Sequence, residues 1–383
     1  MTKAAMCPGI GQALEIVDVE VLAPKAGEVK VRLGASGVCH SDVSVQNGTL
    51  LQPLPAVLGH EGAGVVEEVG EGVTRLAPGD HVVISWVPQC GECYFCARGQ
   101  GELCEVGSAG LITGGLLDGT PRFELDGKPL MQMAASGTFS EVTVVPEIGA
   151  IKIDTSVPLE DAALIGCGVL TGFGAATNTA SIREGDTVAV VGCGGVGLNV
   201  IQGALHAGAE RVIAIDMVDG KLQTAQKFGA TDLVNAGESD PVGQVMEMTG
   251  QRGADVAFEV IGLQQTIDQT FNMARRGGQA ILVGVPAMDV MASFNASMGF
   301  VFSEKQVRGC WYGSSNVHTD VPKLVKLYQD GKLKLSELIS REIRLDEVNE
   351  AFEAMGSGEI ARQVIKYGST SKDSSSTTRA AAR

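Results

Sequence analysis

Four cysteines stand close together in the first half of the chain, in the stretch QCGECYFCARGQGELC. They are Cys90, Cys93, Cys96 and Cys104, with the spacing C-x2-C-x2-C-x7-C. Four thiolates spaced in this way fit a closed tetrahedral zinc site, which stabilises a loop and leaves no position open for chemistry. A disulfide pair and an iron–sulfur cluster are the alternatives. We favour structural zinc, because cysteines two residues apart pair with difficulty in one small loop and nothing else suggests electron transfer.

Three further metal-binding side chains lie far apart in the chain: Cys39 in SGVCHSD, His60 in GHEGAG and Cys167 in IGCGVLTG. A lone buried cysteine is usually just a small apolar residue, and a lone histidine is more often part of the hydrogen-bonded structure. Together, two thiolates and an imidazole predict a zinc site whose fourth position is open to water or substrate. We expect Asp42 to accept a hydrogen bond from the other ring nitrogen of His60 and to fix its tautomer. Glu61 directly follows this histidine, and we predict that Glu61 belongs with Asp42 and His60 to the catalytic residues.

A glycine-rich turn follows the apolar run of TVAVVGCGGVG and opens a helical pattern. In the dinucleotide-binding fingerprint, Gly192 permits the turn, Gly194 lets the backbone approach a pyrophosphate, and Gly197 packs the helix on the strand. Asp216 ends the next predicted strand, about 20 residues further on. A carboxylate there hydrogen-bonds ribose hydroxyls and repels a 2′-phosphate, so the sequence favours NAD over NADP. A surface acid that caps the strand is the simpler alternative.

Segments typical of strands and helices alternate around this fingerprint, which predicts an α/β fold with a doubly wound parallel sheet of the Rossmann type. Short alternating strands and turns precede it, so we expect a β-rich domain into which the Rossmann domain is inserted. The predicted parts are a catalytic domain at 1–170 with a zinc lobe at 88–106, the Rossmann domain at 171–311, a return to the catalytic domain at 312–367, and a small, polar, disordered tail at 368–383.

The composition excludes several classes of protein. The 383 residues, 44% of them hydrophobic and 4% aromatic, are enough for a large buried core. A net charge of −16 would repel a nucleic acid. We find no apolar run of the roughly 20 residues that a membrane helix needs, and no apolar signal-peptide core at the N-terminus. Nine cysteines without an export signal favour thiolate chemistry, so we expect a cytoplasmic protein without a membrane partner.

These motifs, with CHSD, GHEGAGVVEEVG and PGDHV, resemble the zinc-dependent medium-chain alcohol dehydrogenases, particularly the animal-type classes I and III. The resemblance runs from about residue 4 to 367 and implies a GroES-like catalytic domain beside the Rossmann domain. It also implies two zinc ions per chain. The Cys39, His60 and Cys167 set, with one open position, is the set known for the catalytic zinc of this family, and the clustered cysteines would hold the structural ion.

The resemblance implies roles for other residues by matching position. Ser41 would be the first proton acceptor, and Ser44 replaces the surface histidine that ends the proton path in many relatives. The dinucleotide would be contacted by His40, Thr171, Gly192, Gly194, Gly195, Val196, Gly197, Asp216, Lys221, Val285 and Arg362. The substrate pocket would include Trp86, Ala109, Met133 and Trp311, and its flat indole walls favour bulky aromatic or allylic alcohols. An ordinary loop serine and tryptophans that only pack the domain junction are the simpler alternatives.

The predicted function is the reversible oxidation of a primary alcohol to an aldehyde, with hydride transfer to NAD, by a homodimer. The dimer follows from the long segment between Cys104 and Gly137, which dimeric animal-type relatives keep. One rival is a thiol-dependent formaldehyde dehydrogenase of class III, but Ser108 stands where that class carries an arginine for glutathione. Another rival is a non-catalytic Rossmann-type redox sensor, which predicts the loss of dispersed ligands that are all present here.

Overall fold

The computed structural model describes residues 1–356 and 362–368. The chain forms two compact units. Unit 1 comprises Met1–Pro88, Gly107–Gly166 and the described part of Leu335–Arg383, and unit 2 comprises Gln89–Val106 and Cys167–Lys334. These units differ from the predicted parts in three places. The zinc lobe groups with unit 2, unit 2 takes up the chain again at residue 167 instead of 171, and the chain returns to unit 1 at residue 335 instead of 312. From residue 369 on, the predicted tail lies outside the described residues.

The reason for the first difference is a buried side chain just before the first clustered cysteine. The amide of Gln89 hydrogen-bonds to the carbonyl oxygen of Ser315 and to the N–H of Val317, both in unit 2. These two hydrogen bonds connect the lobe to the segment around residue 315. The spacing of the cysteines does not predict this connection.

Unit 1 is rich in strands, in agreement with the predicted β-rich domain. A barrel closes in the order β1, β2, β7, β8 and β4, which are Thr2–Cys7, Glu15–Val21, Phe123–Leu125, Lys128–Gln132 and Ala56–Val57. A second sheet runs in the order β10, β6, β5, β3, β18 and β17, with β9 also paired to β3; these strands are Ala150–Lys152, His81–Ile84, Glu61–Val69, Glu28–Val38, Arg362–Lys366, Ile339–Ile343 and Val142–Pro146. In β3 the alternating Val29, Val31 and Leu33 are buried, as the period of a half-buried strand requires.

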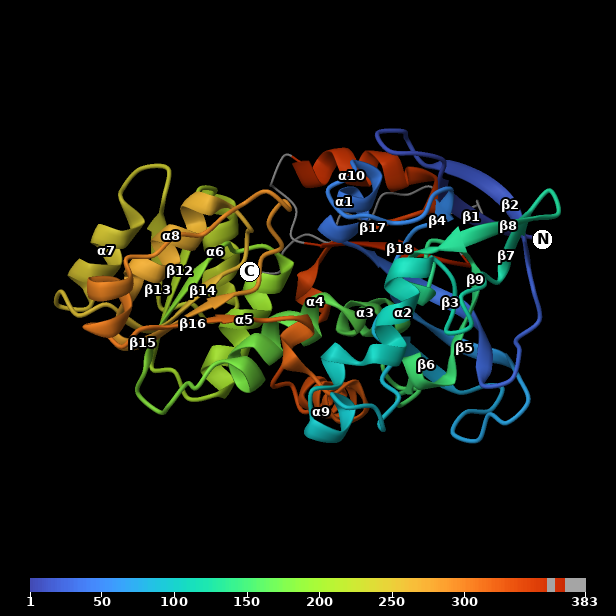
Figure 1. Ribbon diagram of the computed structural model, residues 1–383, viewed down its shortest axis with the longest axis horizontal. Coiled ribbons are helices and arrows are strands. Elements are labelled where there is room, and N and C mark those ends of the chain that lie inside the picture. The colour runs from blue at the N-terminus through green and yellow to red at the C-terminus, as the bar shows by residue number, and fades with distance from the viewer. Residues whose placement is uncertain (357–361, 369–383) are drawn as a thin grey trace. The chain divides into compact units, whose positions relative to one another are not determined.

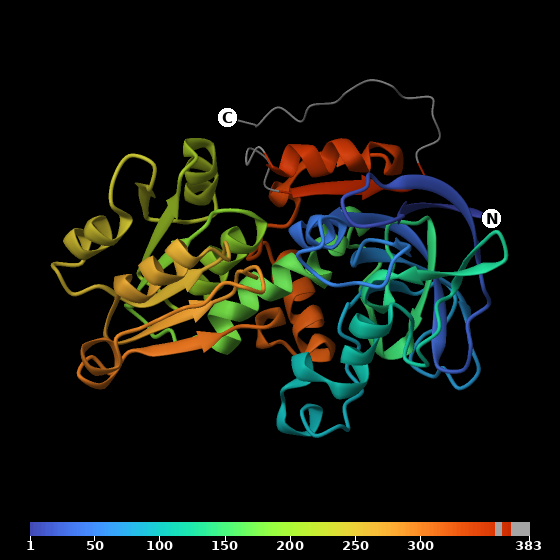
Figure 2. The same cartoon turned by 45° about the horizontal axis from the view of Figure 1, so that its top comes forward.

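Three α-helices lie wholly within the described part of unit 1: α1 (His40–Gln46), α3 (Leu159–Ala163) and α10 (Val348–Gly356). Helix α2 (Glu105–Thr113) begins in unit 2 and continues into unit 1. Helix α10 lies beside β17 and β18 (Figures 1 and 2). Its residues Val348, Ala351 and Phe352 are buried in an apolar cluster with Phe139. The cluster positions the chain on which several of the predicted site residues stand.

Unit 2 is built on a six-stranded parallel sheet in the order β13, β12, β11, β14, β15 and β16. The strands are Asp232–Asn235, Arg211–Asp216, Thr187–Val191, Ala254–Glu259, Ala274–Leu282 and Gln306–Gly309, and the α-helices of its described residues are α4 (Gly168–Gly174), α5 (Gly195–His206), α6 (Asp219–Lys227), α7 (Pro241–Met248), α8 (Gln264–Met273) and α9 (Val317–Gln329). Numbered along the chain, this is the 3-2-1-4-5-6 order of a doubly wound dinucleotide-binding fold, so the predicted fold class is confirmed (Figure 1). Ligands of such sheets bind where the strand order reverses, here between β11 and β14.

Among the described residues, no single helix is long and apolar enough to cross a membrane. The helical segments Leu159–Gly166 and Gly168–Thr179 meet the criterion only together, as a pair bent by 55°.

Candidate zinc and dinucleotide sites

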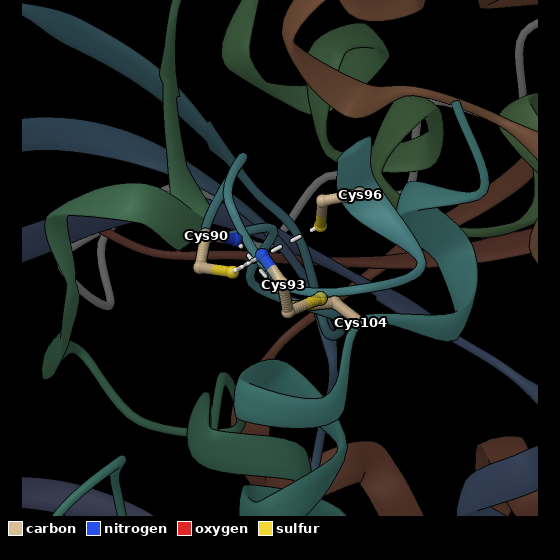
Figure 3. A group of neighbouring side chains, drawn as sticks. All are labelled: Cys90, Cys93, Cys96 and Cys104. Atoms are coloured by element: carbon tan, nitrogen blue, oxygen red, sulfur yellow. Dashed lines mark hydrogen bonds between the residues drawn. The ribbon is translucent and has the colours of Figure 1, made fainter. Parts of the chain in front are cut away.

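The four clustered cysteines converge in the lobe of unit 2 (Figure 3). Their sulfur atoms all lie within 4.8 Å of one another; Cys90 and Cys96 are 4.0 Å apart, and Cys93 and Cys104 are 3.9 Å apart. A tetrahedral zinc–thiolate site with bonds of about 2.3 Å requires sulfur separations of roughly 3.8 Å, so this donor set fits a zinc ion. A disulfide bond measures about 2.05 Å, so neither of these two pairs is bonded.

Backbone N–H groups of the lobe donate hydrogen bonds to sulfur atoms of this group, whereas burial raises the pKa of Cys96 to about 12. The N–H groups of Cys93 and Cys90 donate to the sulfur atoms of Cys90 and Cys104, at 3.3 and 3.4 Å. Hydrogen bonds from the backbone at Cys96 and Glu105 lower the pKa of Cys93 to about 6. The thiolate, which is the form that binds metal, is therefore favoured at this cysteine near neutral pH.

The dispersed metal-binding residues come from the ends of four elements. Cys39 follows β3 and precedes α1, His60 precedes β5, Glu61 begins β5, and Cys167 precedes α4. Cys167 is bonded to Gly166, the last residue of that segment of unit 1. One ligand atom from each of the four residues lies within 4.8 Å of the others, and all four residues are buried. The structure thus brings the three predicted ligands together and adds a carboxylate to them.

The ring of His60 is oriented by Asp42. Its Nδ1 atom lies 3.0 Å from Oδ1 of Asp42, whose carboxylate also accepts hydrogen bonds from the N–H groups of Cys39 and Gly59. Among the described residues, no hydrogen-bond partner reaches the buried Nε2 atom of His60. Leaving such an atom unpaired costs about 1–3 kcal/mol, and a zinc ion held by the two thiolates and Nε2 accounts for it.

The surroundings of His60 shift the pKa of its ring. Burial opposes a charge on the ring, but the carboxylate of Asp42 and the thiol of Cys39 outweigh it and raise the pKa of His60 to about 10. The raised pKa favours the protonated ring, whereas a metal ion would need the neutral ring. Zinc binding at this group must release that proton.

Glu61 is fully buried and forms an ion pair with Arg362, which is itself only 7% exposed. One carboxylate oxygen faces the guanidinium, and the other finds no hydrogen-bond partner among the described residues. The structure therefore shows Arg362 bound to a carboxylate beside the dispersed ligands. Its contact with a dinucleotide stays a prediction.

The glycines of the predicted dinucleotide fingerprint have three different surroundings. Gly192 has a φ of +103°, a conformation that favours glycine, and its N–H donates to the carbonyl oxygen of Ile215. A Cβ atom at Gly197 would strike the carbonyl oxygen of Gly192. A Cβ atom at Gly194, which caps α5 ahead of Gly195, would meet nothing within 4 Å in the described chain. The open space in front of this helix start suits a pyrophosphate.

Asp216 stands at the end of β12, beside this turn. Its carboxylate accepts hydrogen bonds from the N–H groups of Cys193, Met217 and Val218, at 2.9, 2.8 and 3.1 Å. The Nζ atom of Lys221 lies 3.9 Å from the same carboxylate. The carboxylate is therefore held in one position by the backbone, where it can meet ribose hydroxyls.

The other predicted site residues fall into two sets. In unit 1, the hydroxyl of Ser41 lies 3.8 Å from the sulfur of Cys39, and the ring of Trp86 meets that of His60 edge-on at 6.3 Å. Trp86 and Met133 belong to one apolar cluster, Ala109 is half-buried in α2, and His40 is exposed at the start of α1.

In unit 2, Thr171 and Val196 lie in α4 and α5, and Trp311 and Val285 both line a cavity of about 660 Å³.

Comparison with known proteins gives two family matches and several similar proteins. Residues 25–155 match the family described as alcohol dehydrogenase GroES-like domain, and residues 195–330 match zinc-binding dehydrogenase. The S-(hydroxymethyl)glutathione dehydrogenase of Photobacterium damsela subsp. piscicida is 42% identical over 96% of this chain and 100% of its own length. The NDMA-dependent alcohol dehydrogenase of Amycolatopsis methanolica is 40% identical over 96% of this chain and 99% of its own.

The chain belongs to the zinc-dependent medium-chain alcohol dehydrogenase family.

Solved structures of family members agree with this assignment. The benzyl alcohol dehydrogenase of Acinetobacter calcoaceticus superposes with a TM-score of 0.90 at 31% identity, covering 96% of this chain and 99% of its own. An alcohol dehydrogenase zinc-binding domain protein from Burkholderia ambifaria has a TM-score of 0.91 at 35% identity, with the same coverage. Membership makes this protein an oxidoreductase and implies zinc together with a nicotinamide cofactor, which the donor sets and the fingerprint turn fit.

Sequence reasoning missed two features of these sites. The backbone N–H of Cys193, inside the fingerprint, holds the carboxylate of Asp216. Gln89 anchors the cysteine lobe. A glutamine before a cysteine carries no signal of its own, so only the fold identifies it.

Proposed function

We propose that this protein oxidises a primary alcohol to an aldehyde and reduces NAD. The observation that carries the proposal is the buried group of Cys39, His60 and Cys167, in which Nε2 of the histidine has no partner in the described chain. When bound, zinc supplies Lewis acidity toward the alcohol oxygen and the nicotinamide ring accepts the hydride. Two zinc ions per chain follow from the two donor groups.

In this proposal the chain's own residues orient and deprotonate the alcohol. Asp42 holds the ring of His60 in one tautomer through Nδ1. The hydroxyl of Ser41, next to Cys39, takes up the alcohol proton while it gives its own proton to water or to His40, because Ser44 cannot store a proton near neutral pH. Trp86 excludes water beside the ring of His60 and offers a flat apolar wall to the substrate.

The preference for NAD is supported by the fixed carboxylate of Asp216. We expect Asp216→Gly to raise the ratio of kcat/KM with NADP to that with NAD by about 10- to 100-fold, because loss of the charge removes roughly 1.4–2.8 kcal/mol of discrimination. Steady-state rates with both cofactors measure this ratio. A wild type that already prefers NADP contradicts the ribose assignment.

The substrate class is tested by NAD reduction across short, long, branched, allylic and aromatic alcohols. The indole walls and the named activity of the Acinetobacter benzyl alcohol dehydrogenase support an aromatic or allylic alcohol. We expect kcat/KM for benzyl alcohol to exceed that for ethanol. The highest kcat/KM with ethanol would contradict this preference and leave the alcohol dehydrogenase activity standing.

A second candidate is a thiol-dependent formaldehyde dehydrogenase, favoured by the relative named S-(hydroxymethyl)glutathione dehydrogenase. Ser108, half-buried in α2, offers no positive charge to a glutathione carboxylate. The discriminating measurement is NAD reduction with formaldehyde, with and without glutathione. Activity that requires glutathione and exceeds that with every simple alcohol would favour the second candidate.

We also propose a cytoplasmic homodimer. Strand β16 ends the six-stranded sheet of unit 2, and the preceding segment exposes Met288, Met291, Met298 and Phe302. An edge strand beside exposed apolar side chains supports pairing with a second copy. Reduced thiolates in both donor groups suit the cytoplasm. Light scattering is expected to give a dimer, and a clean tetramer would contradict it.

A further inference from the structure

A cavity of about 660 Å³ joins the cysteine lobe to the predicted substrate wall within unit 2. It is lined by Gly99, Gln100, Glu102 and Leu103 of the lobe, and by Val285 and Trp311. Its volume is within the range of small-molecule sites, about 300–1,000 Å³. The lobe therefore supplies part of the surface that a guest in this cavity would touch.

Trp311 is carried on a strained turn. The next three residues, Tyr312, Gly313 and Ser314, all have left-handed backbone conformations, with φ of 51°, 67° and 46°. Tyr312 is also almost fully buried. A bulky residue in this conformation is uncommon, and such a turn persists only where its surroundings hold it. The position of Trp311 therefore depends on whatever fixes residues 312–315.

Two side chains from the helical segment before β11 fix one part of the turn. The hydroxyl of Thr179 lies 2.8 Å from that of Ser314, and the amide of Asn178 donates to the carbonyl oxygen of Gly313 at 3.3 Å. These contacts belong to the same unit and do not involve the lobe.

Gln89 fixes the other part. Its side chain is 2% exposed; the amide nitrogen donates to the carbonyl oxygen of Ser315 at 2.9 Å, and the amide oxygen accepts from the N–H of Val317 at 3.1 Å. Its backbone carbonyl lies 3.1 Å from Nε2 of His318. A Cβ atom at Gly101 would collide with this amide, so the lobe packs directly on it. Gln89 is bonded to Cys90 and thus couples the donor group of the lobe to the turn.

We propose that Gln89 is a positioning residue that holds the Trp311 turn against the cysteine lobe and so sets the width of the cavity for bulky alcohols. This inference rests on the proposed alcohol oxidation, whose substrate range it explains. It gives the lobe a part in specificity, although its metal takes no part in the chemistry.

The test is Gln89→Met, which keeps the length of the side chain and removes both amide hydrogen bonds. In a Trp86→Phe background Trp311 is the remaining tryptophan, and its quenching by acrylamide is expected to increase in the variant. With the native Trp86, KM for benzyl alcohol is expected to rise relative to KM for ethanol by about five- to tenfold, the scale of one or two lost buried hydrogen bonds, with kcat for ethanol nearly unchanged.

Gln202→Met is the matched control. Gln202 is a buried glutamine of the same unit that bonds to another segment in the same way, donating to the carbonyl oxygen of Lys334 at 3.2 Å and accepting from its N–H at 2.8 Å. Its amide also donates to Asn199 at 3.1 Å. Equal loss of thermal stability in both variants, with Trp311 quenching and the KM ratio unchanged, would overturn the proposal.

A second variant and a separate readout distinguish failure to fold from failure of the proposal. Should Gln89→Met not fold, Gln89→Asn, whose shorter amide cannot make both bonds, takes its place with the same expectations. Absence of alcohol oxidation in the wild type would reject the proposed function, whereas the quenching of Trp311 would still accept or reject the positioning role.

Discussion

The two metal-binding groups differ in how the chain assembles them. The clustered cysteines all come from one loop between residues 90 and 104, and three of them are half-exposed. The dispersed group draws on residues 39, 60, 61 and 167, and all of its members are buried. A metal in the first group closes a loop that has little core of its own. A metal in the second would bind to residues that the fold already buries.

Cysteine ligands therefore have different roles in the two metal-binding groups. Where the fold precedes the site, loss of a ligand should remove chemistry and leave stability nearly intact. Where the site organises the fold, loss of a ligand should cost stability first. The following substitutions test that contrast, in order of their expected effect on activity.

Cys39→Ala should have the largest effect. We expect kcat to fall by at least about 10³-fold, at or beyond the loss of a single stabilising donor, with thermal unfolding nearly unchanged. Cys7→Ala is the control, since Cys7 is a buried cysteine of unit 1 outside both groups. A Cys39→Ala protein that keeps wild-type rates would remove this group from the chemistry.

Ser41→Ala comes next. Its hydroxyl lies beside Cys39 and is the proposed proton acceptor, so we expect a loss of about 10²-fold, at the low end for general-base assistance. In Ser44→His an imidazole with a pKa of about 6.5 can store a proton, and alcohol oxidation below neutral pH should speed up. An unchanged pH profile in the second variant, with the first still fast, means that protons leave by another route.

Asp42→Asn should have an intermediate effect. The amide cannot reproduce all three hydrogen bonds that the carboxylate accepts, so the ring of His60 loses its fixed tautomer. We expect zinc affinity or activity to fall by about 10- to 100-fold, the usual effect of losing such a partner. Zinc content after dialysis against a chelator, measured beside Cys39→Ala, separates the two quantities. Wild-type retention and rates would assign the carboxylate to packing alone.

Cys96→Ser should affect activity least and stability most. We expect the free energy of unfolding to fall by roughly 3–5 kcal/mol, since a structural zinc contributes folding free energy directly, while the remaining folded molecules turn over nearly normally. Thermal unfolding and activity per folded molecule measure the two effects. The contrast between the two groups fails if this variant is as stable as wild type, or as inactive as Cys39→Ala.

Much of the architecture could be predicted because the relevant patterns are local. The apolar run before Gly192 predicted β11, and the alternation after it predicted the doubly wound sheet. The grouping of the cysteine lobe with unit 2 could not be predicted, because it depends on the amide of Gln89, which bonds to residues more than 200 positions away. The same holds for Arg362, whose buried partner Glu61 lies 301 positions earlier. Local sequence patterns do not predict pairs of residues that lie so far apart in the chain.

The sequence by itself determined the two donor sets and the fingerprint turn, because ligand type, cysteine spacing and glycine placement are properties of short stretches. Only the tertiary structure decided which atoms meet. It left Nε2 of His60 without a partner among the described residues, placed three backbone N–H groups on Asp216 and set Gln89 against the Trp311 turn. The physical reason is that packing across the whole chain decides which groups lie next to a buried polar atom, and whether any of them can bond to it.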